Sequence, residues 1–149
     1  YYPIGQRGFC PSRKDGWGFD GLGSVPDTMA HFNAETLIIP QCETVGALES
    51  IEAICALDGV DGIFVGPFDL SISMGMPGDF NNPVFQAALD RIINACRKAG
   101  KKCIFFTGTV DGIAAGFARG FDGMAYSLDA AIFIDALKER VEKARQLSK

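Results

Sequence analysis

Short apolar runs alternate with longer amphipathic stretches along most of this chain. Residues 62–66 (GIFVG) and 102–107 (KCIFFT) are the clearest apolar runs, and residues 37–43 and 123–127 have a similar character. Apolar residues at nearly every position are typical of parallel strands that are covered on both faces. The pattern therefore predicts four strands, at 37–43, 62–66, 102–107 and 123–127.

A predicted helix follows each of these strands. Asn82 and Pro83 form a cap and first turn for the second helix, and Gly100 stops it. The four helices are expected at residues 45–57, 83–99, 112–118 and 130–147, with Thr44 capping the first and Asp129 capping the last.

The stretch before the first strand has a different composition. Residues 1–24 are rich in glycine and loop-like, and Pro26 opens a short helix through about Asn33. Residues 16–21 (GWGFDG) imitate part of a dinucleotide-binding loop. That interpretation is rejected, because no strand precedes the glycines and no long helix opens on them.

Four consecutive strand–helix units predict an α/β fold with a parallel sheet and right-handed crossovers. Two architectures fit: a small doubly wound sheet, or half of an eight-stranded barrel, since a whole barrel takes about 250 residues and this chain has 149. Residues 1–149 are expected to form one partial domain, with a loop and short helix at 1–36 and four strand–helix units at 37–149.

Composition excludes several classes of function. A net charge of −4 and a pI of about 4.9 give no reason to expect nucleic acid or an anionic membrane as a partner. No apolar run is long enough to span a bilayer. The five cysteines form no CxxC pair, so they are interpreted as thiols in a reducing compartment, and a cytoplasmic location is expected.

Two carboxylates carry the predicted chemistry. Glu43 lies at the carboxyl end of the first strand, and Asp69 lies just beyond the second. Parallel α/β folds bind ligands at this edge, and neighbouring strands are only about 4.8 Å apart, so both acids can share one cation. Such a site suits Mg²⁺ or Mn²⁺. Two helix-capping or solvated acids are the alternative.

The segment between them, residues 66–71 (GPFDLS), favours a ligand site as well. Glycine allows close approach of the backbone, and Pro67 fixes the turn. The N–H groups of Phe68 and Asp69 are then placed to face a carboxylate in an amide nest. A tight strand–helix turn without a ligand explains the same residues.

At this point a family resemblance becomes specific. Residues 40–44 (PQCET) and 59–71 (GVDGIFVGPFDLS) resemble the HpcH/HpaI aldolase (citrate lyase-like) family, and residues 2–8 (YPIGQRG), Gly100-Lys101 and Asp129 are also similar. The resemblance covers essentially the whole chain. It implies the C-terminal half of a TIM-type (β/α)8 barrel and a class II aldolase. Such an enzyme cleaves or forms 4-hydroxy-2-oxo acids, including 2-keto-3-deoxy sugar acids, through a pyruvate enolate.

The resemblance also implies roles for particular residues. It places the divalent metal, Mg²⁺ or Mn²⁺, on Glu43 and Asp69, and substrate contacts on Gln41 and on the Phe68–Asp69 backbone. The family often has alanine or serine where this chain has Phe68, so a narrower pocket is expected. Phe106, at the end of the third strand, either faces the aldehyde part of the substrate or packs in the core.

The resemblance places the family's base histidine, its carboxylate-binding arginine and a supporting aspartate in the first half of the barrel. No catalytic base is therefore expected in this chain; the lone His31 and Arg7 are interpreted as structural, and Lys101 and Lys102 as surface residues. The expected partners are pyruvate, an aldehyde or 2-oxo acid, a missing N-terminal half-barrel and further copies in a homo-oligomer, with residues 130–147 packing against a neighbouring subunit. A lyase of the citrate lyase type acting on CoA thioesters, and a non-catalytic half-barrel assembly module, are the alternatives.

Overall fold

The computed structural model describes residues 1–10, 13 and 23–147. The chain divides into two compact units, Tyr1–Leu37 and Ile38–Lys149, which are described separately. The glycine-rich segment at residues 16–21 lies outside the described residues.

The α-helix in the described part of the first unit is α1 (Val25–Glu35), which is longer than the helix predicted between Pro26 and Asn33. It begins earlier because Ser24 and Asp27 form a capping box: the Ser24 hydroxyl accepts from the Asp27 N–H, and the Asp27 carboxylate accepts from the Ser24 N–H. The Ser24 hydroxyl also donates to Asp27 Oδ2 at 2.6 Å, and this hydrogen bond, followed by the one from the Ser24 N–H, lowers the pKa of Asp27. The amino terminus of Tyr1 donates to Asn33 Oδ1 at 2.7 Å.

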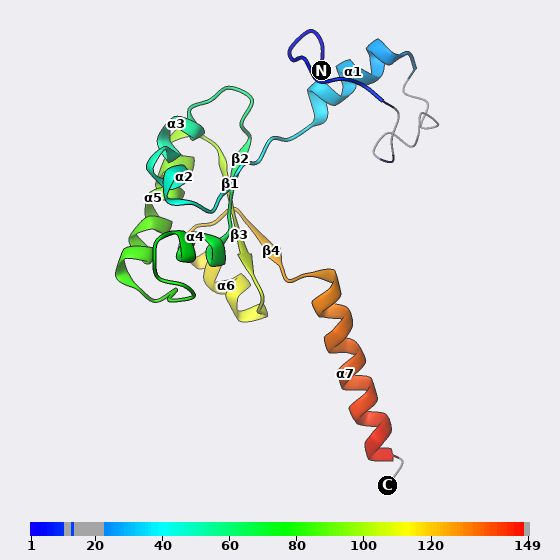
Figure 1. Cartoon of the computed structure of the whole chain (residues 1–149), viewed down its shortest axis with the longest axis vertical. Helices are drawn as coiled ribbons and strands as arrows, with labels where there is room; N and C mark the ends of the chain where they lie inside the picture. The colour runs from blue at the N-terminus through cyan, green and yellow to red at the C-terminus, as the bar shows by residue number, and fades with distance from the viewer. Residues whose placement is uncertain (11–12, 14–22, 148–149) are drawn as a thin grey trace. The chain divides into compact units, whose positions relative to one another are not determined.

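The second unit is a four-stranded parallel sheet in which the strands follow one another in chain order. The strands are β1 (Gln41–Cys42), β2 (Gly62–Val65), β3 (Lys102–Thr107) and β4 (Gly123–Tyr126). The helices are α2 (Val45–Glu49), α3 (Ile51–Cys55), α4 (Pro67–Ser73), α5 (Pro83–Ala99), α6 (Val110–Arg119) and α7 (Asp129–Leu147). Helices α2, α3 and α5 gather on one side of the sheet (Figure 1).

The prediction of a buried strand over residues 37–43 is wrong, because β1 contains only Gln41 and Cys42. Before β1 the backbone still follows β2: the Asp61 N–H donates to the Ile38 carbonyl at 2.9 Å, and the Ile38 N–H donates to Asp61 Oδ2 at 2.7 Å. The side chains of Leu37, Ile38 and Ile39 are nevertheless exposed. The reason is that β1 is an edge strand, so no described strand pairs with its other side.

Three further boundaries differ from the predictions. The helix predicted at 45–57 is interrupted at Ser50, whose φ of −100° and ψ of 10° separate α2 from α3. The short helix α4 occupies a segment for which only a turn was expected. Asp129 is the first residue of α7 rather than its cap, and its carboxylate accepts from the adjacent Ala130 N–H. By contrast, α5 ends at Gly100 as predicted, with a left-handed φ of 68°.

The strand register separates the two faces of the sheet. Cys42, Ile63, Val65 and Cys103 point towards the helices and are buried in the core. The helices contribute the rest of the core: Leu48, Ile51 and Cys55 from α2 and α3, and Phe85, Ala88, Leu89, Ile92, Ile93, Ala95 and Cys96 from α5. The opposite face carries Gln41, Phe64, Ile104 and Phe106, none of which is buried.

Four of the five cysteines, Cys42, Cys55, Cys96 and Cys103, are buried free thiols. Burial raises the pKa of Cys42 to about 11 and that of Cys55 to about 12, and hydrogen bonding to Cys103 followed by burial raises the pKa of Cys96. The folded protein thus keeps these protons to a higher pH than the unfolded chain, whose thiols ionise near 9.

We therefore expect the free energy of unfolding to fall as the pH rises from about 9 towards 12, because the unfolded chain releases thiol protons first. Urea unfolding of the complete protein at a series of pH values under reducing conditions measures this dependence. A Cys55→Ala variant, which lacks one of the shifted thiols, should show a weaker dependence than the parent. An equal dependence in the two proteins would contradict the assignment to Cys55.

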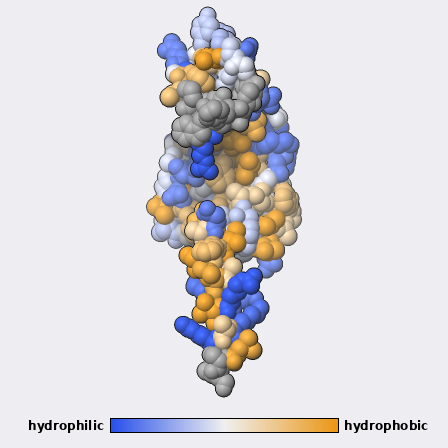
Figure 2. All heavy atoms as spheres, turned by 90° about the vertical axis from the view of Figure 1, so that its right-hand side faces the viewer, coloured by the Kyte–Doolittle hydropathy of each residue, from blue (hydrophilic) through white to orange (hydrophobic). Residues whose placement is uncertain are grey.

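Helix α7 has no buried residue. Its exposed side chains include several large apolar ones: Ile132, Phe133, Ile134, Leu137, Val141 and Leu147. Figure 2 shows apolar surface along this helix, in the lower part of the view. In the described part of the chain, no helix is both long enough and apolar enough to cross a membrane.

Candidate functional site

The predicted site residues lie near the carboxyl ends of β1 and β2, but only Gln41, Phe68 and Asp69 line one cavity, and Glu43 is not part of its lining. Glu43 directly follows β1, and Asp69 lies in the first turn of α4, which starts two residues after β2 ends. A cavity of about 200 Å³ opens at this edge. Its lining residues are Gln41, Phe64, Gly66, Pro67, Phe68, Asp69 and Phe106.

Gly66 directly follows β2 and lies beside Glu43 at the end of β1. A Cβ atom at this position would lie 2.7 Å from Gln41 Nε2 and 3.4 Å from Glu43 Oε2. Both side chains therefore extend over the Gly66 backbone. They occupy the space that the side chain of a larger residue at position 66 would fill. The parallel register explains this, because the pairing of Gln41 with Phe64 and of Cys42 with Val65 places Glu43 next to Gly66.

Among the described side chains, the two carboxylates have no counter-charge. Neither Glu43 nor Asp69 forms a hydrogen bond or ion pair with a described side chain. Within the described ranges, no three His, Cys, Asp or Glu side chains gather closely enough to hold a metal ion by themselves. Two free carboxylates fit a cation such as Mg²⁺ or Mn²⁺, which keeps waters or substrate oxygens as its remaining ligands.

The first turn of α4 offers backbone donors beside these acids. Gly66 is the N-cap and has no side chain to cap the helix, and the first α4 N–H that bonds back to it belongs to Leu70, at 2.9 Å. The N–H groups of Phe68 and Asp69 thus have no acceptor within the helix, as expected for a first turn. They remain available to an anion.

Phe68 and Phe106 both line the cavity. Phe68 is 56% exposed, and its ring meets the Phe80 ring edge-on, with centroids 5.0 Å apart. Phe106 is half-buried on the face of the sheet away from the helices. Of the two interpretations of Phe106, its position favours the one that faces the ligand.

Phe64 lines the cavity but was not predicted from the sequence. Its position in an apolar strand resembles that of Ile63 and Val65, which are both buried in the core. Successive residues of a strand point to opposite faces, so the sequence does predict that Phe64 lies on the same face as Gly66. The sequence alone does not say which of the two faces the helices cover.

The residues interpreted as structural lie apart from this edge or in the other unit. Lys102 is the first residue of β3, at the opposite end of the strand, and it pairs with Asp122 at 3.1 Å. His31 is an exposed residue of α1 in the first unit. The Arg7 guanidinium lies over the Tyr1 ring, also in the first unit.

Comparison with known proteins gives a consistent result. The profile of the HpcH/HpaI aldolase/citrate lyase family matches residues 5–136. The 2-keto-3-deoxy-L-rhamnonate aldolase of Klebsiella pneumoniae is 37% identical over 145 residues, which are 95% of this chain and 52% of that protein. The chain thus spans about half the length of the curated relatives it matches.

Solved structures agree. An HpcH/HpaI aldolase/citrate lyase family protein from Burkholderia cenocepacia matches with a TM-score of 0.80 and 28% identity, over 96% of this chain and 54% of that one. The HpcH/HpaI aldolase of Desulfitobacterium hafniense matches with a TM-score of 0.79 and 26% identity, over 97% and 55% of the two chains. The four strand–helix units therefore correspond to about half of a TIM-type barrel, which favours the half-barrel over the doubly wound sheet.

Proposed function

Because this chain belongs to the HpcH/HpaI aldolase/citrate lyase family, we propose that it carries the metal- and pyruvate-binding part of a class II aldolase. The proposed substrates are 4-hydroxy-2-oxo acids, with 2-keto-3-deoxy sugar acids among them. The 37% identical relative, which is named a 2-keto-3-deoxy-L-rhamnonate aldolase, supports this substrate class. The main structural support is the position of two carboxylates, Glu43 and Asp69, at adjacent strand ends, where neither has a partner among the described side chains.

In the proposed reaction, the bond between C3 and C4 of the substrate breaks to give pyruvate and an aldehyde. The C4 hydroxyl loses its proton as it becomes the aldehyde carbonyl, and C3 gains a proton as it becomes the pyruvate methyl group. In the reverse direction, the addition of pyruvate to the aldehyde, the C3–C4 bond forms and the same two protons move the opposite way. Charge builds up on the C2 keto oxygen in both directions, so the site must stabilise an oxyanion.

Each residue around the cavity has a defined role in this proposal. Glu43 and Asp69 would hold Mg²⁺ or Mn²⁺, which supplies Lewis acidity towards the keto oxygen when it is bound. The N–H groups of Phe68 and Asp69 bind the substrate carboxylate. The Gln41 amide orients the keto end, and Phe64 and Phe106 keep water away from it.

The described residues around the cavity do not include a base for the C4 hydroxyl, because the lining contains neither histidine nor lysine. We propose that other polypeptide supplies this base, from another part of the protein or from a further copy in a homo-oligomer. The exposed apolar side chains of α7 support association with other copies. The buried free thiols support a cytoplasmic enzyme.

A panel of 4-hydroxy-2-oxo acids tests the proposed function in the complete protein. Pyruvate release should require Mg²⁺ or Mn²⁺, and a chelator should abolish it reversibly. Borohydride should not trap a substrate on this part of the protein, because no described lysine lines the cavity. Turnover that survives chelation, or trapping by borohydride, would contradict the proposal.

Oxalate, which resembles the enolate of pyruvate, is expected to inhibit competitively and to occupy the amide nest. We expect the amide resonances of Phe68 and Asp69 to move when oxalate is added to the complete protein with Mg²⁺ present. The amide of Lys102, at the opposite end of the sheet, serves as the internal control. Movement of the Lys102 amide without movement of the other two would place the anion elsewhere.

A further inference from the structure

Three of the seven residues that line the cavity are aromatic. Phe64, Phe68 and Phe106 line it together with Pro67, and its polar side chains are those of Gln41 and Asp69. In the proposed function both polar groups are engaged, since Gln41 contacts the keto end and Asp69 the cation. The wall contributed by the described residues therefore has no remaining side-chain partner for a hydroxyl group on the aldehyde.

The Phe68 ring is held by its neighbours. It meets the Phe80 ring edge-on, with centroids 5.0 Å apart and an interplanar angle of 87°, which is a favourable aromatic geometry. Phe80 in turn packs against Phe85, with centroids 5.6 Å apart. Phe85 is completely buried in the core. The contacts between the three rings therefore connect the Phe68 ring, which lines the cavity, to a side chain that is fixed by core packing.

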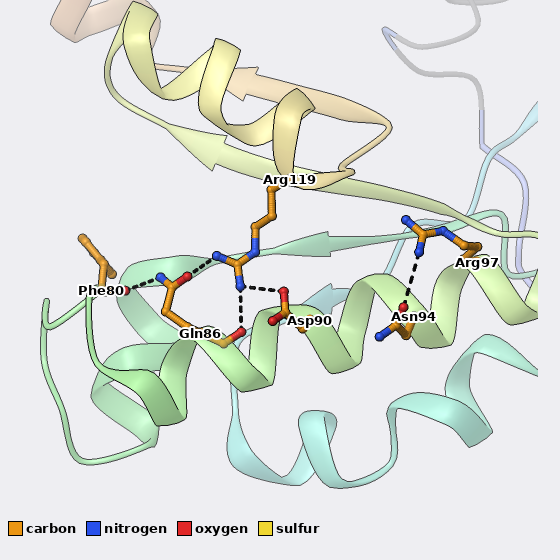
Figure 3. A network of polar contacts seen from close by, with 6 residues as sticks. All are labelled: Phe80, Gln86, Asp90, Asn94, Arg97 and Arg119. Carbon is orange, nitrogen blue, oxygen red and sulfur yellow. Dashed lines mark hydrogen bonds and ion pairs between the residues drawn. The ribbon is translucent and has the colours of Figure 1, made fainter.

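Hydrogen bonds also hold the backbone of Phe80. They come from Gln86, which is itself held by Arg119, and these two residues are called the polar brace. Gln86 Nε2 donates to the Phe80 carbonyl at 2.5 Å. Arg119, from α6, donates through Nη1 to Gln86 Oε1, and through Nη2 to the Gln86 carbonyl at 2.8 Å and to Asp90 Oδ1 at 2.7 Å (Figure 3). The Arg119 side chain is only 25% exposed, so solvent screens this brace less than a surface ion pair.

We propose that Phe68 is a specificity-determining residue for the aldehyde, and that Gln86 and Arg119 are positioning residues that hold it through Phe80. The inference rests on the proposed function and ranks its 4-hydroxy-2-oxo acids, disfavouring those whose aldehyde part places a hydroxyl group against the Phe68 ring. A hydroxyl group placed against this wall loses its water and gains no hydrogen bond, which makes such a substrate less favourable. An alkyl group at the same place has no hydrogen bond to water to lose.

The test uses aldol addition of pyruvate by the complete protein to two aldehydes, propanal and 2-hydroxypropanal, that differ by one hydroxyl group. The measured quantity is the ratio of their kcat/KM values, and comparison between variants removes the intrinsic reactivity of each aldehyde. We expect Phe68→Ser to shift the ratio about tenfold towards 2-hydroxypropanal. The KM for pyruvate should stay unchanged, because the backbone N–H groups remain.

Two further variants separate specificity from a general loss of stability. Phe68→Tyr keeps the ring and adds a hydroxyl, and it should shift the ratio in the same direction as Phe68→Ser. Arg119→Met removes the donors of the brace and should produce a smaller shift of the same sign, while Arg119→Lys keeps more of the parent ratio. The matched control is Arg91→Met on α5, which removes an exposed ion pair with Glu52 at 2.7 Å and should leave the ratio unchanged.

The outcomes are distinguishable. Turnover with an unchanged ratio in both Phe68 variants would overturn the inference and leave the proposed aldolase function in place. Equal ratios in Arg119→Met and Arg91→Met would overturn the positioning roles of Gln86 and Arg119. Failure of the parent protein to use any aldehyde would overturn the proposed function, and the inference with it.

Discussion

Replacement of Asp69 by asparagine, or of Glu43 by glutamine, is expected to abolish metal-dependent turnover in the complete protein. Each change preserves the shape of the side chain and removes its charge. Neither acid has a hydrogen bond or ion pair with a described side chain, so the fold should lose no contact. The cation would lose one of two protein ligands, and stabilisation of the oxyanion would fall with it, by at least about a hundredfold in kcat.

The measurement is the rate of pyruvate release as a function of Mn²⁺ concentration, with thermal unfolding recorded for every variant. Glu49→Gln is the matched control, because Glu49 is an exposed acid at the end of α2 and not at the carboxyl end of a strand. It should retain the parent rate and the parent metal requirement. If either site variant kept near-normal turnover with no greater need for metal, the proposed metal site would be wrong.

The strands in the middle of the sheet were predictable, and the edge strand was not. β2 and β3 have strands on both sides and helices over one face, so their apolar runs match what a buried parallel strand requires. Residues 37–39 are equally apolar, yet they stay exposed beside the sheet edge. Hydropathy indicates that a segment is suited to burial. It does not indicate whether the element that would cover the segment belongs to the described part of this chain.

Helix ends were predictable where one residue fixes the backbone. Gly100 adopts the left-handed conformation that ends α5, and Pro83 occupies its first turn, as both residue types commonly do. The break at Ser50 between α2 and α3 has no such marker, because serine is tolerated in a helix and its side chain makes no capping hydrogen bond here. Packing of Leu48 and Ile51 into one core accompanies the break.

The location of the candidate site followed from topology, since all parallel strands point their carboxyl ends to one edge. Gln41, Phe68 and Asp69 do line one cavity, and Glu43 lies beside it next to Gly66. Their roles remain predictions. The participation of Phe64 and the brace from Arg119 depend on register and on packing between α5 and α6, which the order of residues does not specify.

Gly66→Ala is expected to damage the site severely while leaving the backbone unstrained. Gly66 has a φ of −92° and a ψ of 91°, which alanine also adopts. The added Cβ would lie 2.7 Å from Gln41 Nε2, closer than such atoms approach, so the end of the Gln41 side chain must move, whereas the 3.4 Å to Glu43 Oε2 is an ordinary contact. A displacement of about 1 Å at a reacting centre can cost about a hundredfold in rate, so we expect a loss of that order in kcat/KM.

The same change at Gly46 provides the control, because a Cβ there would have no atom within 4 Å. Gly46 lies in α2, where alanine is a better helix former than glycine. Gly46→Ala should therefore keep the parent activity without losing stability, and Gly66→Ala should lose activity at a nearly unchanged Tm. A Gly66→Ala protein that released pyruvate like the parent would show that Gln41 need not lie over this backbone, and the proposed role of Gln41 would then be wrong.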